Sequence, residues 1–172
     1  YASADTVSAV TNANPAVATT SGSHGITTGN FLEVTSGWAK LNGRIVRSAS
    51  ASGTTVTYEG INTSSTTLYP AGSGTGSVRE ITAWTQISQV LDLSTSGGDM
   101  QFATYSFLEQ DFETQLPTQS SPMTINMTIA DDASLSGYTS LKAAAEARSA
   151  VALKATLPSG SIIVYNGYVS FN

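Results

Sequence analysis

Short runs of alternating apolar and polar residues dominate the chain from Phe31 onward. Between residues 31 and 82 the runs FLEVTSG, GRIVRSAS, TTVTYEG and VREIT are separated by Gly, Ser, Thr and Asn. Alternation with a period of two is typical of half-buried strands, and the separating residues are typical of turns. We therefore expect a small SH3-like β-barrel over residues 26–82. Residues 1–25 show little periodicity, and we expect an N-terminal arm that a partner surface orders.

The longest strand signals lie between residues 84 and 130. WTQISQVLDL (84–93) and MQFATYSFL (100–108) flank a glycine pair at residues 97–98, which suits a turn that requires positive φ. This pattern predicts one long β-hairpin over residues 84–108 with its tip at Ser94, Gly97 and Gly98. The next run, MTINMTIA (123–130), alternates strictly. It predicts a strand with one apolar and one polar face.

One segment has a helical period instead. Its apolar side chains recur at every third or fourth position: Leu135, Tyr138, Leu141 and Ala144. Alanines follow one another from residue 143 to 145, which raises the helix propensity. We expect one α-helix near residues 137–148, with Asp131 and Asp132 as capping candidates. Strand patterns return over residues 150–172, so the predicted fold class is mainly β, a β-sandwich or barrel with one helix.

Composition narrows the chemistry. The 172 residues include no Cys, one His and 11% charged residues, and the net charge is −5. Without Cys there are no disulfides, no thiolate metal sites and no Cys nucleophile. The negative charge argues against a general nucleic-acid binder. No apolar run approaches the ~20 residues of a membrane-spanning helix, and we expect no cofactor or bound metal.

The distribution of charge is more informative than any motif. No Lys or Arg occurs between Arg79 and Lys142. Between residues 84 and 132 there are seven carboxylates: Asp92, Asp99, Glu109, Asp111, Glu113, Asp131 and Asp132. One interpretation is a solvated acidic face. The other is a surface kept anionic so that DNA can slide past it, because phosphates bind where Lys and Arg replace their counter-ions. Both interpretations fit the residues.

Candidate catalytic and ligand-binding groups are few. His24 lies in SGSHGITTG, but the chain has no G-x-S-x-G nucleophile elbow, so a hydrolase built on His24 is only a third hypothesis. Glu109, Asp111 and Glu113 offer oxygen ligands without the spacing of an EF-hand. The glycines at residues 72, 74 and 76 match neither of two phosphate-binding patterns, G-x-G-x-x-G and G-x-x-x-x-G-K-[ST]. We interpret that stretch as a connector.

The second half of the chain resembles a known family. Its motifs, in order, are the predicted hairpin, MTINMTIA, ADDASLSGY at the helix start, LPSGS and NGYVSFN. This order is similar to that of the major tail tube proteins of lambda-like phages with long, non-contractile tails, and it covers residues 83–172. Residues 26–82 resemble a small barrel module inserted in various phage proteins. Family members usually continue with a further strand after NGYVSFN.

The resemblance implies a structural, non-enzymatic protein of the virion. It implies a tail tube core domain made of residues 83–172 together with residues 1–25, with the barrel as an insert. Subunits would assemble in the host cytoplasm into hexameric rings, stacked into a tube that ends on other tail proteins and carries DNA in transit. Asp92, Asp99 and Glu109 become candidates for lining the lumen, and the hairpin tip for contacts between rings.

A second hypothesis belongs to another class. A secreted or surface β-sandwich that binds carbohydrate would use exposed aromatic side chains, and Trp38 and Trp84 are the candidates. The same two residues are equally expected as anchors of a hydrophobic core. Their burial therefore discriminates between the two roles.

Overall fold

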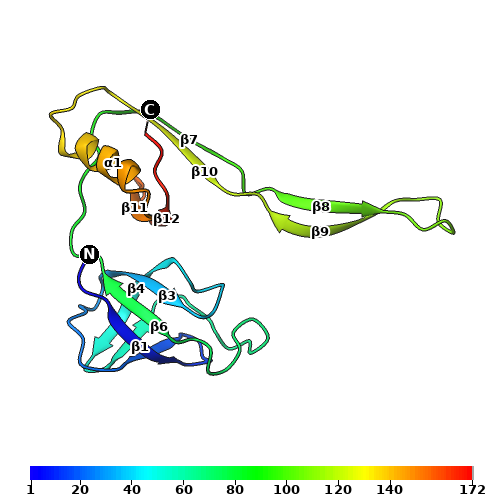
Figure 1. Cartoon of the computed structure of the whole chain (residues 1–172), viewed down its shortest axis with the longest axis horizontal. Helices are drawn as coiled ribbons and strands as arrows, with labels where there is room; N and C mark the ends of the chain where they lie inside the picture. Colours follow the sequence, from blue (N-terminus) through cyan, green and yellow to red (C-terminus); the bar gives the residue numbers. More distant parts are fainter. Residues whose placement is uncertain (172) are drawn as a thin grey trace. The chain divides into compact units, whose positions relative to one another are not determined.

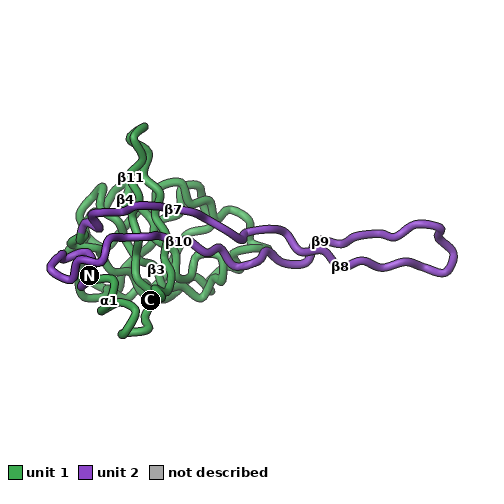
Figure 2. Tube along the Cα trace, turned by 90° about the horizontal axis from the view of Figure 1, so that it is seen from above, with its two compact units in different colours: residues 1–85, 140–172 green, residues 86–139 purple. Residues whose placement is uncertain are grey.

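The computed structural model describes residues 1–171, and its contacts divide the chain into two compact units (Figure 2). Unit 1 comprises residues 1–85 and 140–172, and unit 2 comprises residues 86–139. The described residues form twelve strands and one helix, α1 (Ser136–Ala147). The prediction of a mainly β chain with one helix near residues 137–148 is confirmed. The predicted domain boundaries, 26–82 for the insert and 83–172 for the core domain, stay a prediction.

Six antiparallel strands of unit 1 close into a barrel in the order β1-β2-β5-β4-β3-β6 (Figure 1). They are β1 (Asp5–Val10), β2 (Val17–Thr20), β3 (Phe31–Ser36), β4 (Arg44–Ser52), β5 (Thr55–Tyr58) and β6 (Gly76–Glu80). Pairing of β1 with β6 completes the barrel, and closure removes the open edges that a sheet would present. The predicted barrel is therefore present, with β3 to β6 inside its predicted range.

Residues 1–25 differ from the expected arm, because they supply two strands of this barrel. The side chains of Val7 and Val10 from β1 are buried, as are those of Ala16 and Ala18 beside and within β2. A register shift between Val7 and Ala9 brings inward-facing residues three positions apart, which breaks the period of two. The small alanines add little to an apolar pattern. The sequence therefore carries a weak strand signal here.

The barrel encloses the buried core. Leu32, Val34, Val56, Tyr58 and Val78 are at most 1% exposed. This spacing along each strand follows from the alternation that predicted the strands, because every second side chain points inward. Every buried hydrophobic residue of the described chain lies between Val7 and Ile81.

Trp38 packs into this core through specific contacts. Its Nε1–H donates a hydrogen bond of 2.7 Å to the carbonyl of Pro70, and its ring meets Tyr69 edge to face, with centroids 5.2 Å apart. Gly74 lies over the ring, where an added Cβ would come within 3.0 Å of it. The glycine-rich stretch is thus required for close packing on a tryptophan.

A hairpin of β11 (Val151–Thr156) and β12 (Ile162–Gly167) completes unit 1. It is tied to the barrel by two hydrogen bonds: the amide of Ala152 donates to the Tyr1 hydroxyl at 2.9 Å, and the side chain of Asn166 donates to the carbonyl of Gly43 at 2.8 Å. The ring of Trp84 lies between Phe31 and Lys154, at 5.9 Å from the Phe31 centroid and 4.9 Å from the Lys154 ammonium.

Unit 2 is an antiparallel ribbon in two parts (Figure 2). At its base β7 (Val90–Ser96) pairs with β10 (Thr124–Ile129), and further out β8 (Met100–Tyr105) pairs with β9 (Thr114–Ser120). The predicted hairpin over residues 84–108 is therefore wrong in its pairing. The ribbon turns at residues 106–113, not at Gly97 and Gly98.

The glycine pair produces a kink inside the ribbon. Gly97 and Gly98 both have positive φ, of 84° and 83°, yet the two strands of the ribbon remain hydrogen-bonded beyond them. The amide of Ser121 donates to the carbonyl of Asp99 at 2.8 Å, and the amide of Asp99 donates to the Ser121 hydroxyl at 3.1 Å. A Cβ at Gly97 would collide with the carbonyl of Pro122 on the opposite chain. Glycine is needed here for close approach of two backbones.

Candidate assembly surface

Many large apolar side chains outside the barrel are exposed to water. In the ribbon Leu108 is fully exposed, and Leu91, Phe107 and Phe112 are at least 60% exposed. Large exposed apolar patches on a soluble chain usually mark an interaction site. The apolar residues that gave strong strand signals therefore have no core in the single chain. They need a partner.

The backbone of the same region is also incomplete. Each of the sheets β7–β10, β8–β9 and β11–β12 has two strands only. Among the described residues, every strand in them has a partner strand on one edge only, and the other edge can accept a strand from another chain. An isolated two-stranded ribbon is marginally stable in water. Open edges and exposed apolar side chains thus occur together.

The base of the ribbon has one apolar and one polar face. Residues paired directly across a ladder share a face, and Leu93 pairs with Met127 while Thr95 pairs with Ile125. The opposite face holds only polar side chains: Asp92, Ser94, Ser96, Thr124, Asn126 and Thr128. The side chains of β10 on the apolar face are half-buried, and those on the polar face are exposed. The strict alternation predicted for residues 123–130 is found.

The three acidic residues expected at a lumen occupy different places in unit 2. Asp92 lies in β7 on the polar face, opposite Thr128. Asp99 follows the kink at Gly97–Gly98, and Glu109 lies in the turn of the ribbon. None of the three makes an ion pair with another described residue, because the ion pairs found there, Arg47–Glu59 and Arg79–Glu33, join barrel residues.

The residues expected at the hairpin tip are not at a tip. Ser94 lies within β7, opposite Asn126 of β10, and Gly97 and Gly98 form the kink. The segment at the turn, residues 106–113, reads SFLEQDFE. The charge pattern of the sequence singles out its three carboxylates but not its exposed apolar side chains. The available signal is the mixture of Phe and Leu with Glu and Asp, which begins inside the strand run predicted for residues 100–108.

Hydrogen bonds organise the turn that leads into α1. The carboxylate of Asp132 accepts from the amide and the hydroxyl of Ser134, at 3.0 and 2.6 Å, and these bonds lower the pKa of Asp132. A hydrogen bond donated by Tyr138 to Asp131 raises the pKa of the Tyr138 phenol. The first turn of α1 also lies close to the chain before β7, since a Cβ at Gly137 would approach the carbonyl of Gln86. Asp131 and Asp132 thus have structural partners.

The other candidate groups also have structural partners. His24 accepts a hydrogen bond from the amide of Ile26 through Nδ1, at 3.2 Å, and its Nε2 lies 3.1 Å from the carbonyl of Thr55. Trp38 is 1% exposed and cannot stack on a sugar. The described residues contain no group of three or more His, Cys, Asp or Glu placed to hold a metal ion.

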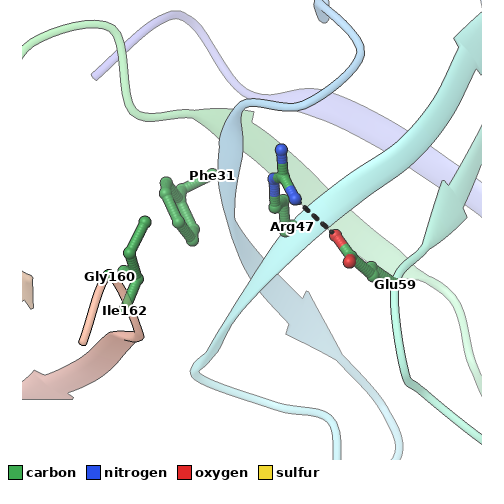
Figure 3. Close-up of a pocket in the computed structure, with 5 residues that line it drawn as sticks. All are labelled: Phe31, Arg47, Glu59, Gly160 and Ile162. Atoms are coloured by element: carbon green, nitrogen blue, oxygen red, sulfur yellow. Dashed lines mark hydrogen bonds and ion pairs between the residues drawn. The ribbon is translucent and has the colours of Figure 1, made fainter. Parts of the chain in front are cut away.

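A shallow pocket in unit 1 offers no site chemistry. About 370 Å³ in volume, it is lined by Phe31, Arg47, Glu59, Gly160 and Ile162 (Figure 3). Its charged groups pair with each other at 3.3 Å and are about half exposed.

In the part of the chain that the structure describes, no helix has the length and apolar character needed to cross a membrane.

Comparison with known proteins agrees with this surface. A family model described as "Phage tail tube protein, TTP" matches residues 36–172. The match begins at the end of β3 and includes β4 to β6 of the barrel, the whole ribbon, α1 and the last hairpin, but not β1 and β2. No curated protein matches the chain, and no solved structure matches it.

Proposed function

The chain belongs to the phage tail tube protein family, and on this premise we propose that it self-assembles into stacked hexameric rings that form the conduit for DNA ejection. Family membership gives the chain a structural role in the virion tail, and we infer from this role that it is not an enzyme. The carbohydrate-binding alternative is not favoured. We further propose that the tail is long and non-contractile, of the lambda-like type, that the tube assembles in the host cytoplasm, and that other tail proteins bind its ends.

The observation that carries the proposal is the open ribbon. In the described chain, six strands outside the barrel have a partner strand on one edge only, and ring closure pairs such edges without leaving a free end. Each copy contributes the same strands, so rotation about one axis repeats one contact around the ring. Stacking of rings then buries apolar residues of the ribbon that are exposed in the single chain.

The two-faced base of the ribbon supports an acidic lumen. An inner wall that passes DNA needs hydrogen-bonding or anionic side chains and few cations. The polar face of β7 and β10 has this composition, with Asp92 among hydroxyl and amide side chains. We assign the lumen to this face. Asp99 and Glu109 remain lumen candidates outside it.

Assembly is tested directly on the purified protein. We expect negative-stain electron microscopy to show hexameric rings or hollow tubes, and sedimentation to show large species that grow with concentration. A chain that stays monomeric at high concentration, with no rings or tubes in any preparation, contradicts the proposal. Removal of the ribbon, residues 90–129, should abolish tubes while the barrel stays folded.

A further inference from the structure

The turn of the ribbon has the character of a ligand for another protein surface. This segment, residues 106–113, is called the tip below. Phe107, Leu108 and Phe112 are 60%, 109% and 64% exposed. Phe107 is held by an edge-to-face contact with Tyr105, at 5.3 Å between centroids, so part of the apolar surface is preorganised. Three carboxylates, Glu109, Asp111 and Glu113, lie among these side chains.

Unit 1 contains a groove with complementary character beside the second half of α1. It is lined by Lys142, Ala145, Glu146, Arg148 and Phe171, has a volume of about 430 Å³, and is called the helix groove below. Arg148 directly follows α1 in a left-handed conformation, with φ of 49°. Neither of the two cations makes an ion pair with another described residue. The groove thus combines the apolar side chains of Ala145 and Phe171 with two cations and one carboxylate.

We propose that the tip of one copy docks in the helix groove of a second copy. Apolar tip side chains lie against Ala145 and Phe171, and the tip carboxylates lie beside Lys142 and Arg148. The proposal rests on self-assembly as the proposed function and adds the contact that joins copies along the tube. Charge complementarity selects this occupant, because residues 86–139 carry seven carboxylates and no cation.

Glu146 refines the proposal. It lines the helix groove together with the two cations and repels an acidic tip. This carboxylate weakens the contact, which keeps joining of copies reversible until many contacts form together. Glu146→Gln should therefore lower the concentration required for tubes, whereas Glu59→Gln, in the barrel, should not.

Engineered cysteines test the contact, because the natural chain has none. One chain carries Phe112→Cys and the other carries Ala145→Cys, so a disulfide between them is necessarily intermolecular. We expect oxidation of mixed tubes to give the covalent pair in high yield. The control mixes Phe112→Cys with Lys40→Cys, which places the second thiol on an exposed barrel turn. Equal yields from the two mixtures, or no covalent pair in assembled tubes, overturn the proposal.

Charge exchange provides a second test if a cysteine variant fails to assemble. Glu109→Lys with Asp111→Lys should raise the concentration needed for tubes roughly tenfold. Lys142→Glu with Arg148→Glu should do the same, and all four changes in one chain should restore assembly. The matched control, Lys40→Glu with Arg44→Glu, should not rescue the tip variant. Failure of the four-fold variant where each double variant folds overturns the proposal.

Different results contradict the proposed assembly into tubes and the proposed docking of the tip. Absence of tubes from the unmodified protein contradicts the proposed function itself. Tubes that form normally while tip and groove variants have no effect contradict only the docking of the tip.

Discussion

Trp38 and Trp84 look alike in the sequence but lie in different surroundings. Trp38 is enclosed by the barrel core, with a hydrogen-bonded indole and a glycine packed on its face. Trp84 is half-buried, between Phe31 and Lys154. The sequence predicted a core role or a sugar-binding role for both residues. Burial assigns the core role to Trp38, and no feature of the sequence distinguished the two.

Trp38→Ala should destabilise the barrel by about 3–5 kcal/mol, as expected for a large aromatic removed from a packed core. Trp84→Ala should cost less, about 1 kcal/mol, because this side chain is only partly buried and lies outside the barrel core. Chemical denaturation followed by circular dichroism measures both, without relying on tryptophan fluorescence. Equal losses for the two variants would show that the contacts of Trp38 do not set barrel stability.

Asp132 should make the turn before α1 sensitive to acid. The pKa of its carboxyl in the folded chain lies below the ordinary value of 3.8, because it accepts two hydrogen bonds from Ser134. A lowered pKa means that the stabilising contribution is present above about pH 4 and is lost as the pH falls through the folded value. NMR of the unassembled subunit should show the carboxyl titrating below 3.8.

Asp132→Asn provides the control for this acid sensitivity. It keeps an acceptor for Ser134 but cannot ionise, so the turn should lose its dependence on pH in that range. A titration of Asp132 at or above its ordinary value would mean that the bonds from Ser134 do not form in solution.

At the scale of elements, the positions of strands followed from the sequence but their partners did not. The run MTINMTIA gives β10 nearly to the residue, because alternation is a local property. The partner of β7 is a non-local choice. The glycine pair at 97–98 is a strong hairpin signal, but here it serves as a kink, and β7 pairs with β10 more than twenty residues later. The sequence identified Asp92, Asp99 and Glu109 as acidic residues of this region. The face of the ribbon on which Asp92 lies could not be predicted, because it depends on the pairing of β7 with β10.

Two engineered disulfides separate the observed ribbon from the predicted hairpin. Ser94 pairs with Asn126, so Cys substitutions at these positions should oxidise spontaneously. A hairpin turning at Gly97–Gly98 would instead place Ser94 opposite Gln101. We expect Ser94→Cys to form an intramolecular bridge with Asn126→Cys and not with Gln101→Cys, as read by mass spectrometry after digestion.

The polar face of the ribbon base has its own test. Asp92→Lys should leave tube assembly nearly unchanged, because the side chain is exposed and has no ion pair among the described residues. If this face lines the lumen, the new cations should slow DNA exit from assembled virions, since phosphates bind Lys by releasing counter-ions. Leu93→Lys, on the opposite face, should disturb assembly first. Unchanged ejection kinetics for Asp92→Lys would remove this residue from the lumen.

The molecule contains one part with a closed sheet and a buried core, and another part with open strand edges and exposed apolar side chains. Residues 1–81 contain all the buried hydrophobic side chains of the described chain and carry four cations and four carboxylates. The remainder supplies the whole net charge of −5 and has no comparable core. A barrel that closes its own hydrogen bonds is stable by itself, whereas strands with open edges and exposed apolar residues gain stability from a second chain.

Hydrogen exchange should separate these two parts. In the unassembled subunit we expect slow exchange at backbone amides of the barrel strands and fast exchange over residues 90–129. Assembly should slow exchange in the ribbon and leave the barrel nearly unchanged. Mass spectrometry of peptides from both states measures this. A ribbon already protected in the single subunit would show that its strands do not depend on neighbours.

The open edges of the ribbon also restrict when and where the protein is safe to accumulate. A strand edge does not discriminate between a neighbour in the correct register and any other extended segment. Copies that meet each other before they meet a growing end can therefore precipitate as disordered aggregates. Synthesis must be matched by rapid consumption at a starting platform, or the surplus must be shielded. The open strand edges that allow a long polymer to form thus limit how much free subunit can accumulate before assembly begins.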